Sequence, residues 1–243
     1  MTKKLLMIIW TIVLVGILAF LISKTRHKEI FVEIVPSELF TVSRLDSLTG
    51  TNDYVMLIMG ADSCNMCDFV YIMPVINNYP VSKYFLKKDY HDNNLLLSQA
   101  LHTTGFPTSY FLNQDYEIEG MIMNHIDNLD GDLHKILIEK QAICPVSIHG
   151  IKDNNVLPML SFSLKSAICY LQSDFDGVKR NARMSLDYGE YFFNNYMLYS
   201  YYKNHVNTDS VDYYKEKALN CLHGGDFIIY KNLIEELEET LNT

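Results

Sequence analysis

The sequence contains little cysteine and few basic residues. Five cysteines among 243 residues are too few for a disulfide scaffold, and the second Cys-x-x-Cys motif that a zinc ribbon requires is absent. The 20 Lys and Arg residues are outnumbered by 29 Asp and Glu residues and form no basic stripe that could displace the counterions of a nucleic acid. These absences exclude disulfide-rich scaffolds, zinc ribbons and nucleic-acid-binding proteins.

The charge is unevenly distributed along the chain. Residues 1–28 hold five Lys and Arg residues and no acid, so residues 29–243 carry 15 basic and 29 acidic residues, a net charge of −14. Hydrophobic residues make up 49% and charged residues 20% of the chain, which is typical of a globular protein. A chain of this length can bury a substantial core, as one large domain or two small ones.

The longest apolar run lies at the N-terminus. Leu5–Ile22 is interrupted only by Thr11 and Gly16, and as a helix it would span about 27 Å, close to the thickness of a hydrocarbon core. We therefore predict that residues 1–28 form an N-terminal transmembrane anchor or signal. No small-x-small cleavage site follows the run, which favours an uncleaved anchor over a signal peptide.

One Cys-x-x-Cys motif joins Cys64 and Cys67. The apolar run Tyr54–Met59, of strand length, precedes the motif, and a helical pattern at Phe69–Asn77 follows it. The unpaired N–H groups and the dipole at the start of a helix favour a thiolate. A Gly-x-Pro-Thr segment at 105–108 stands before a later predicted strand. Together these features predict a redox-active dithiol.

Strand and helix patterns alternate through residues 29–143. A helix and turn are expected at residues 36–53. The expected strands are Ile30–Val35, Tyr54–Met59, Tyr84–Lys88, Ser109–Leu112 and Ile118–Met123, and the further helices are Phe69–Asn77, Asn93–Leu101 and Leu129–Ile138.

This order of elements, with the two motifs in it, resembles the thioredoxin family over about residues 29–141. The resemblance implies an α/β thioredoxin-like fold, in which helices flank a central mixed sheet. It also implies that Cys64 is the attacking thiol and Cys67 the resolving thiol. Pro107 would be in the cis form facing the dithiol, which would let the backbone of Phe106 pair with an extended substrate peptide.

The chain departs from the family at several positions around the dithiol. Ser63 stands where the family usually has Trp, Asn65 and Met66 stand where Gly-Pro is typical, and Ile58 aligns with the family's buried acid. The dipeptide between the cysteines and the nearby charges tune the reduction potential. The direction of the chemistry, whether reduction, oxidation or isomerisation, therefore stays open.

Residues 144–158 read as a linker, and strand patterns end before it. Residues 159–243 are predicted to form an all-α domain of helical hairpins. Val178 and Val211 begin corresponding stretches 33 residues apart, and this period resembles tetratricopeptide repeats. The five expected helices are Leu160–Leu171, Asp174–Tyr188, Tyr191–Asn204, Asp209–Leu222 and Asp226–Leu241.

A stripe of aromatic residues runs along the third of these expected helices. Tyr188, Phe192, Tyr196 and Tyr199 recur at helical spacing, which predicts a buried face. Tyrosine also combines apolar area with a hydroxyl, so a peptide-binding face for a protein partner stays open.

The other cysteines and histidines are expected to be structural. Cys169 and Cys221 fall in apolar helical surroundings and are predicted to be small core residues. The histidines without ligand spacing relative to the cysteines, expected to be surface or satisfied structural residues, are His91, His102, His125 and His134.

We predict a membrane-tethered thiol–disulfide oxidoreductase that acts on protein or peptide disulfides and needs no metal or cofactor. Basic residues flank both ends of the apolar run, so the positive-inside rule does not orient it. Membrane-tethered dithiol proteins usually face the oxidising side, which predicts an extracytoplasmic, periplasmic location for the soluble part.

Two alternatives stay open. The first is a non-catalytic scaffold that binds partner proteins through its C-terminal helices. The second, less favoured, is a copper(I)-handling protein, because thiolates and thioethers are the soft ligands that copper(I) prefers. Its candidate ligands are Cys64, Cys67, Met59, Met66 and Met73.

Overall fold

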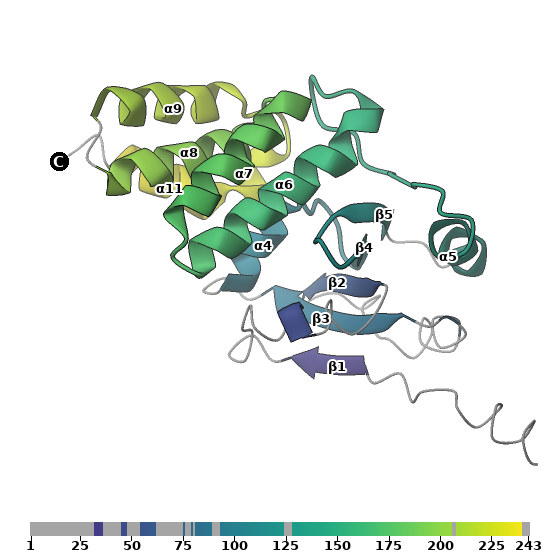
Figure 1. Ribbon diagram of the computed structural model, residues 1–243. Coiled ribbons are helices and arrows are strands. Elements are labelled where there is room, and N and C mark those ends of the chain that lie inside the picture. The colour runs from purple at the N-terminus through teal and green to yellow at the C-terminus, as the bar shows by residue number, and fades with distance from the viewer. Residues whose placement is uncertain are drawn as a thin grey trace, which may run out of the picture. The chain divides into compact units, whose positions relative to one another are not determined.

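The computed structural model describes residues 32–35, 45–47, 54–61, 75, 79, 81–88, 93–123, 128–205 and 208–239 (Figure 1). The strands run in the order β1-β3-β2-β4-β5 across one sheet, in which β3 pairs in parallel with β1 and β2, and β4 pairs antiparallel with β2 and β5. Their bounds are β1 Val32–Val35, β2 Val55–Ala61, β3 Ser82–Lys88, β4 Thr108–Leu112 and β5 Ile118–Met123.

Helices follow and separate these strands. Their bounds are α4 Asn93–Ala100, α5 Leu129–Leu137, α6 Asp153–Leu171, α7 Phe175–Tyr188, α8 Phe192–Asn204, α9 Thr208–Asn220, α10 Asp226–Ile229 and α11 Lys231–Glu239. Local signals explain both ends of α7. The carboxylate of Asp174 accepts a hydrogen bond from the Gly177 N–H at 3.0 Å, as an N-cap residue does, and Gly189 follows the last residue.

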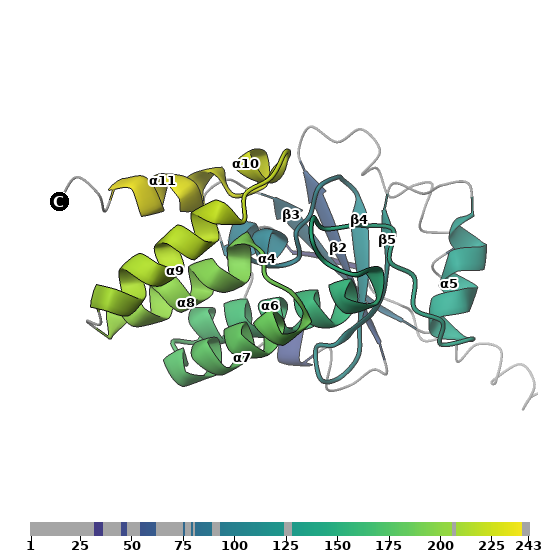
Figure 2. The same cartoon turned by 90° about the horizontal axis from the view of Figure 1, so that it is seen from above.

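Helices cover both faces of the sheet (Figure 2). Side chains alternate along a strand, so β2 contributes to two different cores. Val55, Leu57 and Met59 pack into a large core with α4 and α6, whereas Met56 and Ile58 pack into a smaller core with α5. The continuous apolar character of β2 follows from this burial on both sides.

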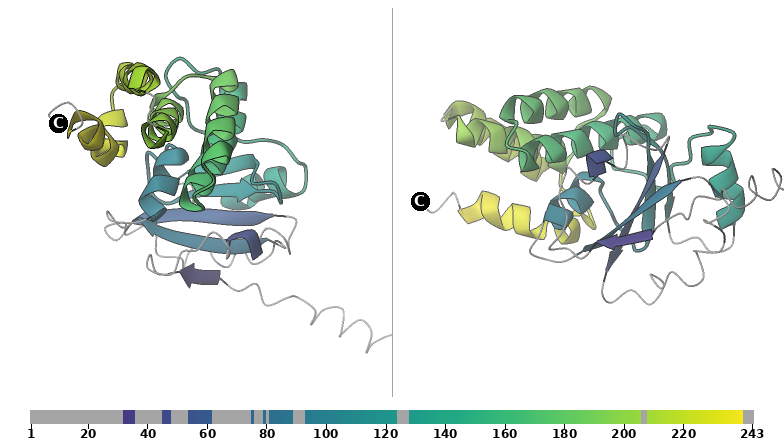
Figure 3. Two further views of the ribbon diagram at one scale, coloured as in Figure 1. Left: turned by 60° about the vertical axis from the view of Figure 1, so that its left-hand side comes forward. Right: turned by 60° about the horizontal axis from the view of Figure 1, so that its bottom comes forward.

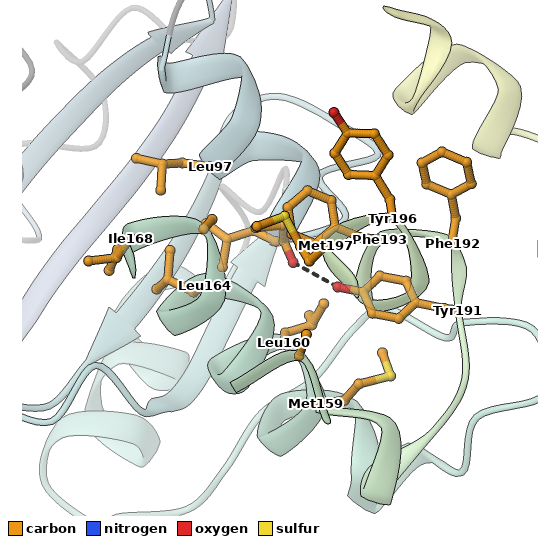
Figure 4. Close-up of a cluster of buried hydrophobic side chains, with 14 of the residues drawn as sticks. Leu97, Met159, Leu160, Leu164, Ile168, Tyr191, Phe192, Phe193, Tyr196 and Met197 are labelled. Carbon is orange, nitrogen blue, oxygen red and sulfur yellow. Dashed lines mark hydrogen bonds between the residues drawn. The ribbon is translucent and has the colours of Figure 1, made fainter. Parts of the chain in front are cut away.

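The C-terminal helices pack in consecutive pairs, α6 with α7 and α8 with α9. Helix α8 is buried on every side from Phe192 to Tyr201, and its polar residues Asn194, Asn195 and Ser200 are buried together with the aromatic ones. This confirms that Phe192, Tyr196 and Tyr199 are core residues, whereas the prediction is wrong for Tyr188, which ends α7 and is 36% exposed. Figure 4 shows side chains of α8, such as Phe193 and Met197, beside Leu160 and Leu164 of α6 and Leu97 of α4.

The predicted fold class, a thioredoxin-like α/β fold followed by a separate all-α domain, is wrong. The described chain is mostly helical, and the sheet contains an antiparallel unit in which β4 pairs with β2 and with β5, while β2 also pairs in parallel with β3. The C-terminal helices share one hydrophobic core with the sheet. Among the described residues, no helix is long and apolar enough to cross a membrane, and the run Leu5–Ile22 lies outside them.

The physical reason for the error lies in α6. This helix begins at Asp153, inside the predicted linker 144–158, and buries Val156 and Leu157 in its first turns. Its apolar side chains pack against the sheet and α4 rather than only against α7. A sequence pattern shows that a helix has an apolar face, but it does not show which surface covers that face.

We expect Leu164→Ala to lower the free energy of unfolding by about 2–5 kcal/mol, because Leu164 is fully buried in the core that the sheet shares with the C-terminal helices. Since the core is shared, amides of both β4 and α8 should lose hydrogen-exchange protection by the same free energy. The exposed Phe227 provides the control, and Phe227→Ala should change stability by less than about 0.5 kcal/mol. Loss of protection in α8 alone would contradict a shared core.

Candidate functional site at the start of strand β4

The structure describes two of the four predicted site residues. Cys64 and Cys67 lie outside the described residues. The bond between Phe106 and Pro107 is cis, as the resemblance implied, and it directly precedes β4. Pro107 is buried, and the half-buried Phe106 packs against the large core. The described part of the candidate site therefore consists of the end of α4 and the start of β4.

The pairing register fixes which end of the sheet this segment occupies. Met59 of β2 lies opposite Thr108, the first residue of β4. The two strands are antiparallel, so the residues that follow Met59 and the residues that precede Thr108 lie at the same end of the sheet. Ala61, the last residue of β2, is at this end.

Hydroxyl groups hold the connection between α4 and β4. The Tyr110 hydroxyl donates to the Leu101 carbonyl at 3.1 Å and accepts from the Thr103 hydroxyl at 2.9 Å. The Thr108 hydroxyl donates to the Gly105 carbonyl at 2.7 Å. Burial raises the pKa of Tyr110, so its hydroxyl keeps the proton that it donates. The segment that leads to Phe106 therefore has its backbone fixed by side chains.

His102 lies in the same connection and is 5% exposed. Its Nδ1 is 2.8 Å from the Tyr230 hydroxyl, and its Nε2 is 3.8 Å from Oδ1 of Asp226. Its ring also packs against the rings of Tyr191 and Tyr230. Burial lowers the pKa of His102, and the Asp226 carboxylate opposes this shift in part. The arrangement suits a neutral imidazole with its proton on Nε2, which lets Nδ1 accept from Tyr230.

Two further side chains join the end of α4 to the C-terminal helices. Gln99 donates to the Ile229 carbonyl at 2.9 Å and to Oδ1 of Asn232 at 2.6 Å. The Tyr191 hydroxyl donates to the Ala100 carbonyl at 3.1 Å, and a dashed line marks a hydrogen bond of this tyrosine in Figure 4. Figure 3 shows α11, in yellow, beside the blue α4.

We call these contacts the α4 clasp. Its members are Gln99, Ala100, His102, Tyr191, Asp226, Ile229, Tyr230 and Asn232. Sequence reasoning missed the clasp, because its partners are 91 to 133 positions apart. No local pattern signals such a pairing.

The described cysteines are free thiols that are poorly suited to nucleophilic chemistry. Cys144, Cys169 and Cys221 are half-buried and pack against the large core. Burial raises the pKa of each thiol, and it raises that of Cys221 to about 11. All three are therefore protonated at neutral pH, and the thiol is a poor nucleophile. Cys169 and Cys221 are predicted to be buried core residues, but they are only half-buried and pack against the large core.

The described histidines behave as predicted. His102 is a satisfied structural residue, and His134 is exposed beside Glu139. His91 and His125 lie outside the described residues. Met59, a candidate copper ligand, is fully buried in the core. In the part of the chain that the structure describes, no group of three or more His, Cys, Asp and Glu residues could hold a metal ion.

We expect stability to fall as the pH decreases below about 6.5, the ordinary pKa of histidine in an unfolded chain. Because burial lowers the pKa of His102, the unfolded chain takes up a proton in this range that the folded protein does not, so stability rises with pH. His102→Asn removes this contribution. Urea unfolding at pH 7.5 and 5.5 should show a smaller pH dependence for His102→Asn than for the wild type, with His134→Asn as the control. Equal pH dependence in all three proteins would contradict the assignment.

No protein-family model matches the chain, and no curated protein matches it. The function is therefore inferred from the residues themselves.

Proposed function

We propose that the protein is a thiol–disulfide oxidoreductase that acts on protein or peptide disulfides through Cys64 and Cys67. The soluble part would be held at a membrane through residues 5–22 and would face the extracytoplasmic side. The observation that carries the proposal is the pairing of Met59 with Thr108.

This register relates the dithiol to the Phe106–Pro107 segment. Cys64 follows Ala61, the last residue of β2, by three positions. Three residues of fully extended chain span at most about 11 Å. Phe106 and Pro107 directly precede Thr108 at the same end of the sheet. One extended substrate peptide is long enough to contact both. The Cys-x-x-Cys and Gly-x-Pro-Thr motifs, which resemble those of the thioredoxin family, support the same proposal.

The proposed reaction proceeds by two thiol–disulfide exchanges. The thiolate of Cys64 attacks one sulfur of the substrate disulfide, a mixed disulfide forms, and the other substrate sulfur leaves as a thiolate that takes up a proton. Cys67, as a thiolate, then attacks Cys64, which closes the Cys64–Cys67 bond and releases the second substrate thiol. Two electrons pass from the dithiol to the substrate, and the reverse sequence oxidises a substrate dithiol.

The remaining cysteines support this choice of nucleophile. Cys144, Cys169 and Cys221 are the other three of the five, and burial keeps all of them as thiols. Cys64 and Cys67 are the two whose spacing allows a reversible disulfide.

A second candidate is a non-catalytic scaffold that binds a partner through its helices. Exposed apolar side chains on α7 favour it: Met184 is 40% and Tyr188 36% exposed, and Tyr188 stacks on Phe162 of α6. In this case partner binding would persist when Cys64 and Cys67 are both replaced by Ser, and Met184→Asp would weaken it.

We expect Cys67→Ser to accumulate disulfide-linked adducts, because the mixed disulfide on Cys64 can no longer be resolved. The full chain in its membrane is incubated with a peptide disulfide, and the adducts are identified by non-reducing electrophoresis and mass spectrometry. Cys64→Ser should abolish the adducts, and Cys144→Ser should leave the wild-type pattern unchanged.

The enzyme hypothesis fails if Cys67→Ser traps nothing and the Cys64–Cys67 pair of the wild type does not exchange with glutathione.

A further inference from the structure

The α4 clasp joins the C-terminal helices to the segment that carries Phe106 and Pro107. Tyr230, between α10 and α11, bonds to His102, which is only four positions before Phe106. We propose that Tyr230 and His102 are positioning residues, through which the C-terminal helices set the placement of the Phe106–Pro107 segment. The claim that this segment binds a substrate rests on the proposed function, whereas the claim that the C-terminal helices position it does not.

The backbone around His102 links the clasp to the segment that carries Phe106 and Pro107. His102 has a φ of 48°, in the left-handed region, and its N–H donates to the Gln99 carbonyl while the Thr103 N–H donates to the Ser98 carbonyl. Asn and His tolerate this conformation better than most residues. The chain therefore leaves α4 in a tight turn whose direction depends on where His102 is held.

The other end of the segment is fixed by β4. The Thr108 hydroxyl bonds to the Gly105 carbonyl, and the Tyr110 hydroxyl bonds to the Leu101 carbonyl. Residues 101–108 are thus held by β4 on one side and by the clasp on the other. If the clasp opens, the segment loses its hydrogen bond to Tyr230 through His102, while its contacts to β4 stay.

Gln99, His102, Tyr191 and Tyr230 of the clasp are buried, whereas Asn232 is exposed, so an open arrangement would leave buried polar groups unpaired. Tyr230 is fully buried, and Gln99, His102 and Tyr191 are each at most 5% exposed. Buried donors and acceptors are almost always paired in folded proteins, because the loss of a partner costs their desolvation. The closed clasp is therefore strongly favoured over an open one.

The ring of Tyr230 is held independently of its hydroxyl. It stacks on Phe192 with a centroid distance of 4.5 Å, and it also packs near Phe193. Tyr230→Phe should therefore keep the aromatic packing and remove only the hydrogen bond to His102. Tyr196 is a matched control, because it also stacks on Phe192 and is buried, but its hydroxyl donates to Glu236 instead.

The charged and titratable groups that face His102 are few. Asp226 of α10 is the carboxylate, and Tyr191 and Tyr230 are tyrosines that burial keeps neutral. Protonation of His102 removes the acceptor that Tyr230 uses. We therefore expect acidification to loosen residues 101–108 in the wild type, and to have less effect in His102→Asn.

The test compares the full-length wild type with Tyr230→Phe and Tyr196→Phe by amide hydrogen exchange. We expect amides of residues 101–108 to exchange about fivefold faster, or more, in Tyr230→Phe and at the wild-type rate in Tyr196→Phe. His102→Ala should resemble Tyr230→Phe. His102→Asn, which keeps a polar group near the position of Nδ1 and suits the left-handed backbone, should restore most of the protection at pH 7.5.

The same proteins are assayed for reaction with a peptide disulfide. Tyr230→Phe should raise KM about fivefold and change kcat less, because the segment binds the substrate but does not react with it. Unchanged exchange at residues 101–108 in Tyr230→Phe would overturn the positioning proposal, as would an equal increase across α6 and β5. If the wild type reacts with no disulfide, the proposed function fails, and the exchange rates still decide the positioning.

Discussion

The rest of the structure depends on the pairing of the buried His102 side chain with Tyr230 and Asp226. A buried imidazole without partners is costly, and in this protein the Tyr230 hydroxyl bonds to Nδ1 while the Asp226 carboxylate faces Nε2 at 3.8 Å. The sheet and the C-terminal helices cannot separate without leaving these groups unpaired. Hydrophobic packing joins the same two parts of the protein. Helices α6 and α8 bury their apolar surfaces against α4 and the sheet rather than against each other alone.

This constraint gives the C-terminal helices a role in the chemistry that we propose for Cys64 and Cys67. The helices contact the chain just before Phe106 and Pro107, at the end of the sheet where β2 ends. A dithiol needs its substrate held in a fixed orientation, because exchange requires three sulfur atoms in line. A site supported by a rigid second layer provides this better than an isolated loop.

The sequence predicted the features that arise from local interactions. The apolar run Tyr54–Met59 forms a strand buried on both faces, because such a run has no polar side to expose. The predicted helix Asp174–Tyr188 is confirmed to within one residue at its start, where Asp174 caps α7, because an N-cap needs only a carboxylate three positions before a free N–H. The predicted helix Asp226–Leu241 is interrupted at Tyr230, whose side chain enters the core. The clasp and the packing of α6 on the sheet were not predictable, because they depend on residues far apart in the chain.

The central claim is that His102 and Tyr230 act as one unit. A double-mutant cycle with His102→Ala, Tyr230→Phe and the double variant measures this directly, with the free energy of unfolding determined by urea at pH 7.5. The account predicts a coupling free energy between about 0.5 and 3 kcal/mol, as found for residues that share a hydrogen bond. Additivity within about 0.3 kcal/mol would contradict it, because the two side chains would then contribute independently.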